Sequence, residues 1–181
     1  MAQVSSAQRH RGRGAWWLAL LLAIVPITSL ASDAGIRIGL LFNFIKFAEW
    51  PVTALEQDDA PLNVCIVKGD PAMSAGVAVL GTHRVQGHPL QPRVISQPDE
   101  AAGCHVLYLP ARERGQADAF LDAAHEATLT VSDAQDFVDM GGMIGLVLQD
   151  NRYVFEINNE QLRHAQLRLN PQVLRLAQRV L

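Results

Sequence analysis

The sequence lacks most of the short motifs that mark enzymes and metal sites. It has no Gly-x-Ser-x-Gly elbow, no His-Glu-x-x-His and no Cys-x-x-Cys. The glycines of the run GGMIG (141–145) end a predicted helix and open a predicted strand, whereas a phosphate-binding loop follows a strand and opens a helix. No two histidines after residue 31 have the i, i+4 spacing of a helical zinc pair. We therefore expect a protein that is not an enzyme and that carries no cofactor and no metal.

Basic residues are also scarce. The chain has 15 Lys and Arg against 18 Asp and Glu, and three of the arginines (Arg9, Arg11 and Arg13) lie in the first 31 residues, which contain no acid. Residues 32–181 therefore have 15 − 3 = 12 basic and 18 acidic side chains, a net charge near −6. Such a balance argues against nucleic acid and anionic membrane surfaces as partners.

The first 31 residues have the pattern of a secretory signal peptide. The three arginines are followed by the uncharged, apolar stretch Ala15–Leu30, and Ser29 and Ala31 are small residues at the spacing of a cleavage site. An uncleaved membrane anchor is the alternative, but the stretch is short for a span of about 20 residues and contains Pro26. We predict cleavage near Ala31, a periplasmic protein, and one domain over residues 32–181.

The run LLFNFIKFAEWP (40–51) predicts an unusually apolar helix. Its three polar residues, Asn43, Lys46 and Glu49, recur at every third position and form one narrow stripe. Pro51 is expected to stop the helix, because the residue before a proline is driven out of the helical region. Three aromatic residues of this run are candidate contacts with a dimer mate or a partner, although core packing would also explain them; they are Phe44, Phe47 and Trp50.

The remaining pattern alternates strands with helices. Strands are predicted at 62–67, 93–96, 104–109, 127–131, 143–148 and 152–158, and helices at 71–80, 114–125, 133–139, 159–166 and 171–180. Asp70 and Asn170 each precede a proline and are expected to cap helices, and Asp150-Asn151 predicts a two-residue hairpin turn. The stretch 81–92 has several glycines and prolines and is predicted as loop. This order predicts an α/β fold: a single domain with a largely parallel sheet, helices on both faces and a C-terminal antiparallel hairpin.

The two cysteines, Cys65 and Cys104, both lie in apolar runs that predict buried strands. In an oxidising compartment a disulfide between them is the leading hypothesis, and it requires the two strands to be neighbours with Cα atoms less than about 7 Å apart. Two buried free thiols are the alternative.

Two groups of polar residues are candidate binding sites. The first lies in the turns after parallel strands, where open α/β sheets bind ligands; its residues are Lys68, Gly69, Asp70, Arg112, Ser132 and Asp133. Helix caps and solvated strand ends would explain them as well. The second group is a C-terminal set of arginines with one nearby acid, Glu160, which would suit an acidic partner or be a solvated helix face; its members are Arg163, Arg168, Arg175 and Arg179.

Several stretches together resemble the YfiR family of periplasmic regulators. They are LLFNFIKFAEWP (40–51), LNVCIVKGDP (62–71), CHVLYL (104–109), the run 129–158 with its GGMIG and FEIN, and the closing AQLRLNPQVLRLAQRVL. The resemblance implies a non-enzymatic repressor that binds the periplasmic sensor domain of an inner-membrane diguanylate cyclase and so lowers cyclic diguanylate and biofilm formation. It also implies a homodimer, an outer-membrane lipoprotein as a second partner, and a disulfide between Cys65 and Cys104. Some family members have a second cysteine pair, which this chain lacks.

Two functions therefore follow as expectations. The first is a periplasmic regulator of an inner-membrane signalling protein, and the alternative is a periplasmic protein that binds or senses a small ligand.

Overall fold

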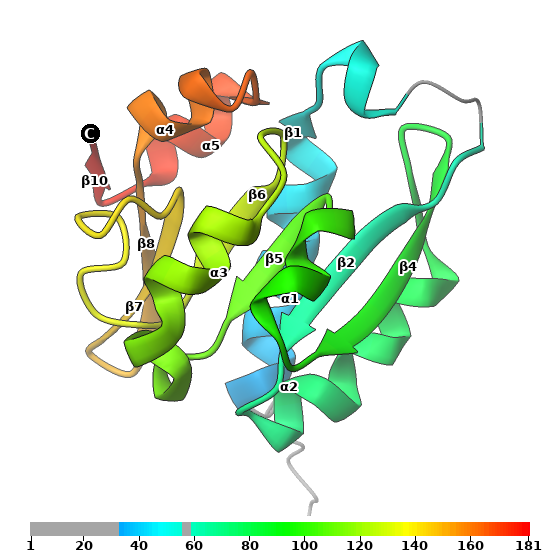
Figure 1. The fold of residues 1–181 in the computed structure, drawn as a ribbon. Helices are drawn as coiled ribbons and strands as arrows, with labels where there is room; N and C mark the ends of the chain where they lie inside the picture. Colours follow the sequence, from blue (N-terminus) through cyan, green and yellow to red (C-terminus); the bar gives the residue numbers. More distant parts are fainter. Residues whose placement is uncertain (1–32, 56–58) are drawn as a thin grey trace, which may run out of the picture. The chain divides into compact units, whose positions relative to one another are not determined.

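The main sheet has eight strands in the spatial order β10-β8-β7-β6-β5-β2-β4-β3 (Figure 1). The computed structural model describes residues 33–55 and 59–181, so the predicted signal peptide lies outside the described residues. The strands of the sheet are β2 (Leu62–Val67), β3 (Arg84–Val85), β4 (His88–Ile95), β5 (Val106–Leu109), β6 (Leu129–Ser132), β7 (Ile144–Gln149), β8 (Arg152–Ile157) and β10 (Arg179–Val180). No helix within the described ranges has the length and apolar character needed to cross a membrane.

Five neighbouring strands of this sheet are parallel, namely β4, β2, β5, β6 and β7. Numbered by their order in the chain, they lie in the order 2-1-3-4-5, which is a doubly wound arrangement with its switch point between β2 and β5. The prediction of an α/β fold with a largely parallel sheet is confirmed. Ligands of such sheets bind beyond the carboxyl ends of the strands, near the switch point.

The predicted C-terminal hairpin is present. β7 and β8 pair antiparallel across a turn in which Asp150 (φ 48°) and Asn151 (φ 59°) both have positive φ, as a type I′ turn requires. The predicted helix over 171–180 is too long, however. α5 (Pro171–Leu176) ends when Ala177 becomes extended, and β10 then pairs in parallel with β8 and forms the edge of the sheet.

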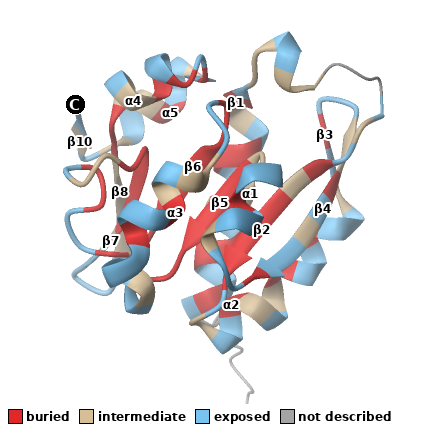
Figure 2. Cartoon of the chain, viewed as in Figure 1, coloured by how far each residue is buried: buried red, intermediate tan, exposed pale blue. Residues whose placement is uncertain are grey.

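Hydrophobic cores cover both faces of the sheet, because side chains alternate between the faces along each strand. On one face, Val64 and Ile66 of β2 pack beneath α1 (Asp33–Phe47), α2 (Pro71–Gly76) and the 3₁₀ helix η2 (Val77–Thr82). On the other face, Cys65 and Val67 pack beneath the 3₁₀ helix η3 (Pro98–Gly103) and α3 (Ala117–Ala123). Figure 2 shows the buried strands between helices that are exposed on their outer sides.

Helix α1 ends at Phe47, four residues before the proline that was predicted to stop it. Ala48 and Glu49 instead form strand β1, which pairs antiparallel with Leu169 and Arg168 of β9 (Arg168–Leu169). The backbone N–H of Asn170 also donates to the carbonyl of Phe47 at 3.0 Å. A partner segment from the far end of the chain therefore ends the helix. The polar stripe is as predicted: Asn43, Lys46 and Glu49 are exposed.

Three other predicted elements differ from the structure. Residues 84–95, predicted as loop and a short strand, form the hairpin β3–β4, whose turn uses Gln86 (φ 52°) and Gly87 (φ 92°). Prolines in β4 are tolerated because only the two-residue β3 lies on its outer side. The predicted helix 133–139 is a series of turns, because Asp136 has a φ of 59°. The predicted helix 114–125 begins as the 3₁₀ helix η4 (Ala111–Gln116) and continues as α3.

Candidate functional site

A buried arginine, Arg37, occupies the carboxyl edge of the sheet at the switch point. Its side chain is 7% exposed, and its guanidinium pairs with three carboxylates: Asp33 at 2.7 Å, Asp70 at 2.8 Å and Asp133 at 2.7 Å. It also donates a hydrogen bond to the hydroxyl of Tyr108 at 3.2 Å. These five residues are called the Arg37 cluster below.

The Arg37 cluster joins elements that are far apart in the sequence. Asp70 follows β2 and caps α2, where its carboxylate accepts the N–H groups of Ala72 and Met73. Asp133 follows β6 and accepts the N–H of Ala111, which follows β5, at 2.7 Å. Because Arg37 is on α1, one guanidinium fixes this helix to the ends of two strands.

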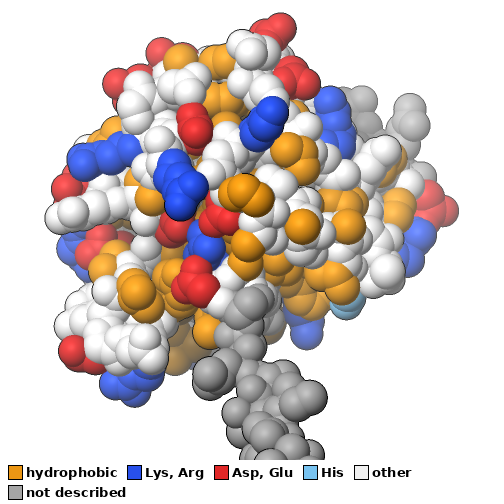
Figure 3. Space-filling model, turned by 90° about the horizontal axis from the view of Figure 1, so that it is seen from below, with side chains coloured by type: hydrophobic (Ala, Val, Ile, Leu, Met, Phe, Trp, Pro, Cys, Tyr) orange, Lys and Arg blue, Asp and Glu red, His pale blue; other side chains and the backbone are white. Residues whose placement is uncertain are grey.

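Electrostatics at the Arg37 cluster keep the carboxylate of Asp70 ionised. Burial alone would raise the pKa of Asp70, but the N–H of Met73 and the guanidinium of Arg37 stabilise the charged form and lower that pKa below its usual value. Burial and the nearby Asp133 raise the pKa of Tyr108, which stays protonated. Figure 3 views the molecule from the side where the parallel strands have their carboxyl ends. Acidic and basic side chains gather near the middle of that face.

The structure brings the predicted ligand residues to one edge of the sheet, but several of them already have partners. Asp70 and Asp133 are bound to Arg37. Ser132 is fully buried, and its hydroxyl donates to the carbonyl of Leu109 at 2.6 Å and accepts the N–H of Ala134 at 2.9 Å. Lys68 and Arg112 are exposed.

The turns after β2 and β5 also pack closely at Gly69. A Cβ atom at this position would lie 2.7 Å from the carboxylate of Glu113, so a larger residue would displace the Glu113 side chain.

Sequence reasoning missed Arg37, Asp33 and Tyr108. A signal for Arg37 was present, because it is a cation in a largely apolar segment and an acid stands four residues before it. Nothing local could have indicated that Asp70 and Asp133 complete the set.

The predicted aromatic contacts fall into two classes. Phe44 is 2% exposed and packs edge-on against Phe155 of β8, with ring centroids 5.1 Å apart. Core packing, which the sequence left open, is therefore its role within this chain, and its ring is not available to a partner. Phe47 and Trp50 are half-buried at the edge of the same core.

Three of the four predicted arginines are free at the surface. Arg163 on α4 (Asn159–His164), Arg168 on β9 and Arg175 on α5 are exposed, and none of them forms an ion pair with another residue of the described ranges. Residues 159–176, which carry these three arginines, are called the C-terminal basic segment below. Next to Arg175, Leu176 is 74% exposed.

The fourth arginine, Arg179, is a structural residue. Its guanidinium forms a bidentate pair with Asp139, at 2.9 and 2.7 Å, and reaches Glu156 at 2.7 Å. These bonds tie β10 to β8 and to the turns before β7. The hydrogen bond from Arg179 lowers the pKa of Asp139 below its usual value. Arg179 is therefore occupied within the chain, unlike the other three arginines.

Pairing of β1 with β9 brings the two groups of predicted contacts together. Glu49 lies opposite Arg168, so Trp50 follows directly after a residue that is paired with the C-terminal basic segment. A partner that contacts Arg168 would therefore lie close to the end of the aromatic run.

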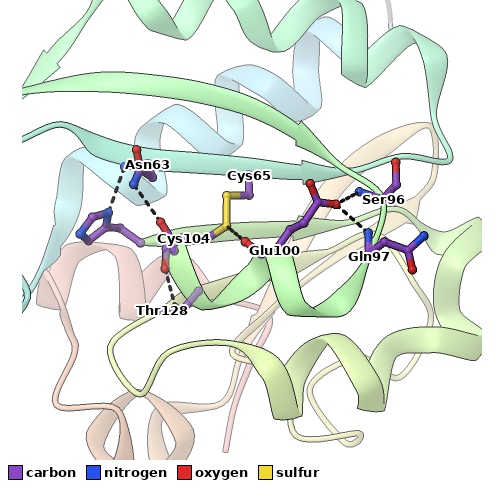
Figure 4. Close-up of a disulfide and its surroundings, with 9 residues drawn as sticks. Asn63, Cys65, Ser96, Gln97, Glu100, Cys104 and Thr128 are labelled. Atoms are coloured by element: carbon purple, nitrogen blue, oxygen red, sulfur yellow. Dashed lines mark hydrogen bonds between the residues drawn. A yellow bond between two sulfur atoms is a disulfide. The ribbon is translucent and has the colours of Figure 1, made fainter.

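The predicted disulfide between Cys65 and Cys104 is present (Figure 4). It joins β2 to the residue that ends η3, just before the neighbouring strand β5, with Cα atoms 5.9 Å apart. Both residues are buried, at 0% and 3% exposure. Thr128 supports the site by donating its hydroxyl to the carbonyl of Cys104 at 2.6 Å.

His105, the next residue, links the same strands. The backbone N–H of Asn63 donates to its Nδ1 at 3.0 Å, and its Nε2 lies 3.2 Å from the carbonyl of Ala54. Because Nδ1 must accept, the ring is neutral and Nε2–H is the donor. Burial lowers the pKa of His105 below its usual value, in agreement with these roles.

The described residues thus form a doubly wound α/β domain in which Arg37 occupies the strand ends and a disulfide lies beside two neighbouring strands. A family model described as YfiR/HmsC-like matches residues 34–178, so the chain belongs to that family. Members of the family act in the periplasm as regulators and are not known as enzymes. The disulfide is consistent with export to that compartment.

Solved structures with the same fold are distant in sequence. A conserved domain protein from Vibrio cholerae O1 biovar eltor matches with a TM-score of 0.54 and 11% identity, over 82% of this chain and 60% of that one. The ABC domain from Streptococcus pneumonia, solved in complex with L-Trp, matches with a TM-score of 0.50 and 10% identity, over 72% of this chain and 58% of that one. The chain therefore spans about three fifths of these proteins, and the likeness concerns the fold alone.

Proposed function

We propose that this protein is a periplasmic repressor. It binds the periplasmic sensor domain of an inner-membrane diguanylate cyclase, or of a related signalling protein, and holds the cyclase inactive, which lowers cyclic diguanylate and biofilm formation. The observation that carries the proposal is the family match over residues 34–178. The signal peptide predicted over residues 1–31 supplies the route to the periplasm.

The geometry of the Arg37 cluster supports a binding role over a catalytic one. Its carboxylates pair with a buried arginine, and this arginine and backbone N–H groups stabilise the charged form of Asp70. A general acid or base needs a pKa near the working pH, whereas the pKa of Asp70 is moved further away from it. The cluster therefore suits a rigid strand-end scaffold.

The surface proposed to contact the cyclase consists of the C-terminal basic segment together with Phe47 and Trp50. Arg163, Arg168 and Arg175 are exposed cations in a chain whose residues 32–181 are acidic overall, so they favour an acidic partner surface. The half-buried aromatic rings and the exposed Leu176 supply apolar contact area beside them. The same surface is available to an outer-membrane lipoprotein that competes for the repressor.

Capture from membranes tests the proposed partner. The mature protein, immobilised and mildly crosslinked to detergent-solubilised inner membranes, should retain a cyclase with a periplasmic domain, and the crosslinks should fall in residues 159–176. Deletion of the gene should raise cellular cyclic diguanylate. An unchanged level of cyclic diguanylate after deletion would exclude a cyclase as the target. Sedimentation of the purified protein tests the homodimer directly.

Binding of a small ligand at the strand ends is the second candidate function. Its support is that Lys68 and Arg112 are exposed beside the switch point, where this class of sheet binds ligands. The structurally similar ABC domain is described with L-Trp bound. A thermal-shift panel of metabolites tests this function, because a specific ligand raises the midpoint of unfolding as its concentration increases.

A further inference from the structure

A cleft of about 700 Å³ lies on the opposite edge of the sheet from the Arg37 cluster. It opens between α3 and α4, at the amino ends of β6 and β7, where Thr128, Thr130 and Met143 line it. Ligand-binding pockets in proteins have volumes of roughly 300–1,000 Å³, so the cleft has the size of a small-molecule site. None of the residues predicted to bind a ligand or a partner lines this cleft.

The walls and the floor of the cleft differ in chemistry. One wall carries three exposed carboxylates, from Asp118 and Asp122 of α3 and from Glu126 in the loop after it. The opposite wall carries Gln161 and His164 of α4. The floor has apolar side chains from Leu121, Met140 and Met143, of which Met143 is 7% exposed, and polar ones from the buried Thr128 and Thr130. His125 also lines the cleft.

No lysine or arginine is among the described residues that line the cleft. Arg114 lies at the Met140 side of the cleft, with its Nε 3.4 Å from the sulfur of Met140 and its guanidinium 3.7 Å from Asp136. His164 pairs with Glu160 at 3.6 Å, which adds another acid at the rim.

We propose that the cleft binds an aliphatic amine cation. The ammonium groups lie against Asp118, Asp122 and Glu126, and the methylene chain lies along the floor, where methionine side chains adapt to an irregular apolar surface. An anionic ligand would be repelled by three carboxylates, and a neutral apolar ligand would remove their water without replacing it. Within the described ranges no group of three His, Cys, Asp or Glu residues is placed to hold a metal ion.

The cleft borders the surface proposed to contact the cyclase, because Gln161 and His164 also belong to the C-terminal basic segment, and it would give the regulator a small-molecule input. Such an input changes repression only if the amine binds the free repressor and the complex with different affinities. The proposal does not depend on the identity of the protein partner.

Calorimetric titration of the mature protein with spermidine tests the proposal, at about 0.15 M salt to suppress non-specific attraction. We expect saturable binding, and no binding of 1,8-octanediol, which has a similar apolar chain without the charges. Asp122→Asn and Glu126→Gln should each weaken spermidine binding about ten-fold, the cost of losing a charge-assisted hydrogen bond. Ala124→Trp, which fills the cleft from the residue that follows α3, should abolish binding while cooperative unfolding shows that the variant folds.

The matched control is Asp99→Asn, which removes the same charge from an exposed position on η3 outside the cleft. Spermidine should bind this variant as it binds the original protein. Equal weakening by Asp99→Asn and Asp122→Asn would overturn the proposal, because the attraction would then belong to the whole acidic surface. Binding of an arginine-rich peptide without binding of free amines would also overturn it and would make the cleft a docking site for a basic protein segment.

Discussion

Arg37 and Asp133 lie 96 positions apart in the sequence, and their side chains meet at 2.7 Å at the carboxyl edge of the sheet. This pair fixes α1 to the end of β6, and the same guanidinium holds Asp70 at the end of β2. The switch point of the sheet, where many α/β proteins place a ligand, is here closed by a side chain of the chain itself.

Loss of the guanidinium should therefore be costly. Arg37→Met keeps much of the apolar stem but leaves Asp70 and Asp133 partly buried without their countercharge, and we expect a loss of about 3–5 kcal/mol in the free energy of unfolding. Arg37→Lys should lose less, because it keeps the charge and loses only the fork geometry. Urea unfolding monitored by circular dichroism measures both values. A loss below about 1 kcal/mol for Arg37→Met would mean that water already screens the cluster.

The Cys65–Cys104 disulfide should be a second large contribution to stability. It closes a loop with a sequence separation of 39, and on the chain-entropy model such a crosslink is worth about 4 kcal/mol. The double variant Cys65→Ala/Cys104→Ala should therefore unfold at lower urea concentration than the oxidised protein. Thiol titration of the denatured, unreduced protein should find no free thiol. Two free thiols in that titration would contradict the crosslink directly.

Stability should fall as the pH decreases from 7.5 to 5.5 (about one unit on each side of the usual histidine pKa), because of His105. Its pKa is lowered in the folded state, so the unfolded chain takes up a proton near the ordinary value of 6.5 while the folded chain does not. Neutral His105 makes its full contribution to the free energy of unfolding above the pKa of the unfolded chain, and this contribution is lost as the pH falls below that value. Carboxylates with lowered pKa values, such as Asp70, lose their contribution only at more acidic pH.

His105→Asn isolates this effect. The amide oxygen can still accept the N–H of Asn63, but the side chain does not titrate, so the variant should show a flatter dependence of unfolding free energy on pH. His164→Asn, at an exposed position, serves as the control and should retain the fall. An equal slope in the protein and in His105→Asn would assign the pH dependence to other groups.

Local sequence signals predicted much of this fold. Asp70-Pro71 and Asn170-Pro171 each begin a helix with the expected side-chain cap, and Asp150-Asn151 forms the expected hairpin turn. The errors arise where a distant segment decides the local structure. β1 forms because β9 pairs with it, and β10 forms because β8 is beside it.

For the candidate sites too, the sequence predicted the residues, but their contacts depend on distant segments. Exposed arginines could be predicted from their clustering in the sequence, but only the structure separates Arg179, which is bound by Asp139 and Glu156, from the three that are free. Likewise, Asp70 and Asp133 were predicted at the strand ends from the order of elements. Their shared contact with Arg37 depends on how α1 crosses the sheet, and no local pattern encodes that crossing.

The free arginines give the most direct test of the proposed repressor surface. The triple variant Arg163→Ala/Arg168→Ala/Arg175→Ala should bind the partner's periplasmic domain roughly ten-fold more weakly, at about 0.5 kcal/mol for each exposed charge. Its affinity should also depend less on salt, because rim charges act mainly through screened attraction. The matched control removes three exposed arginines from other parts of the surface, Arg93, Arg112 and Arg152, and changes the net charge by the same amount. Equal weakening by the two triple variants would assign the effect to net charge and would remove the C-terminal basic segment from the proposed interface.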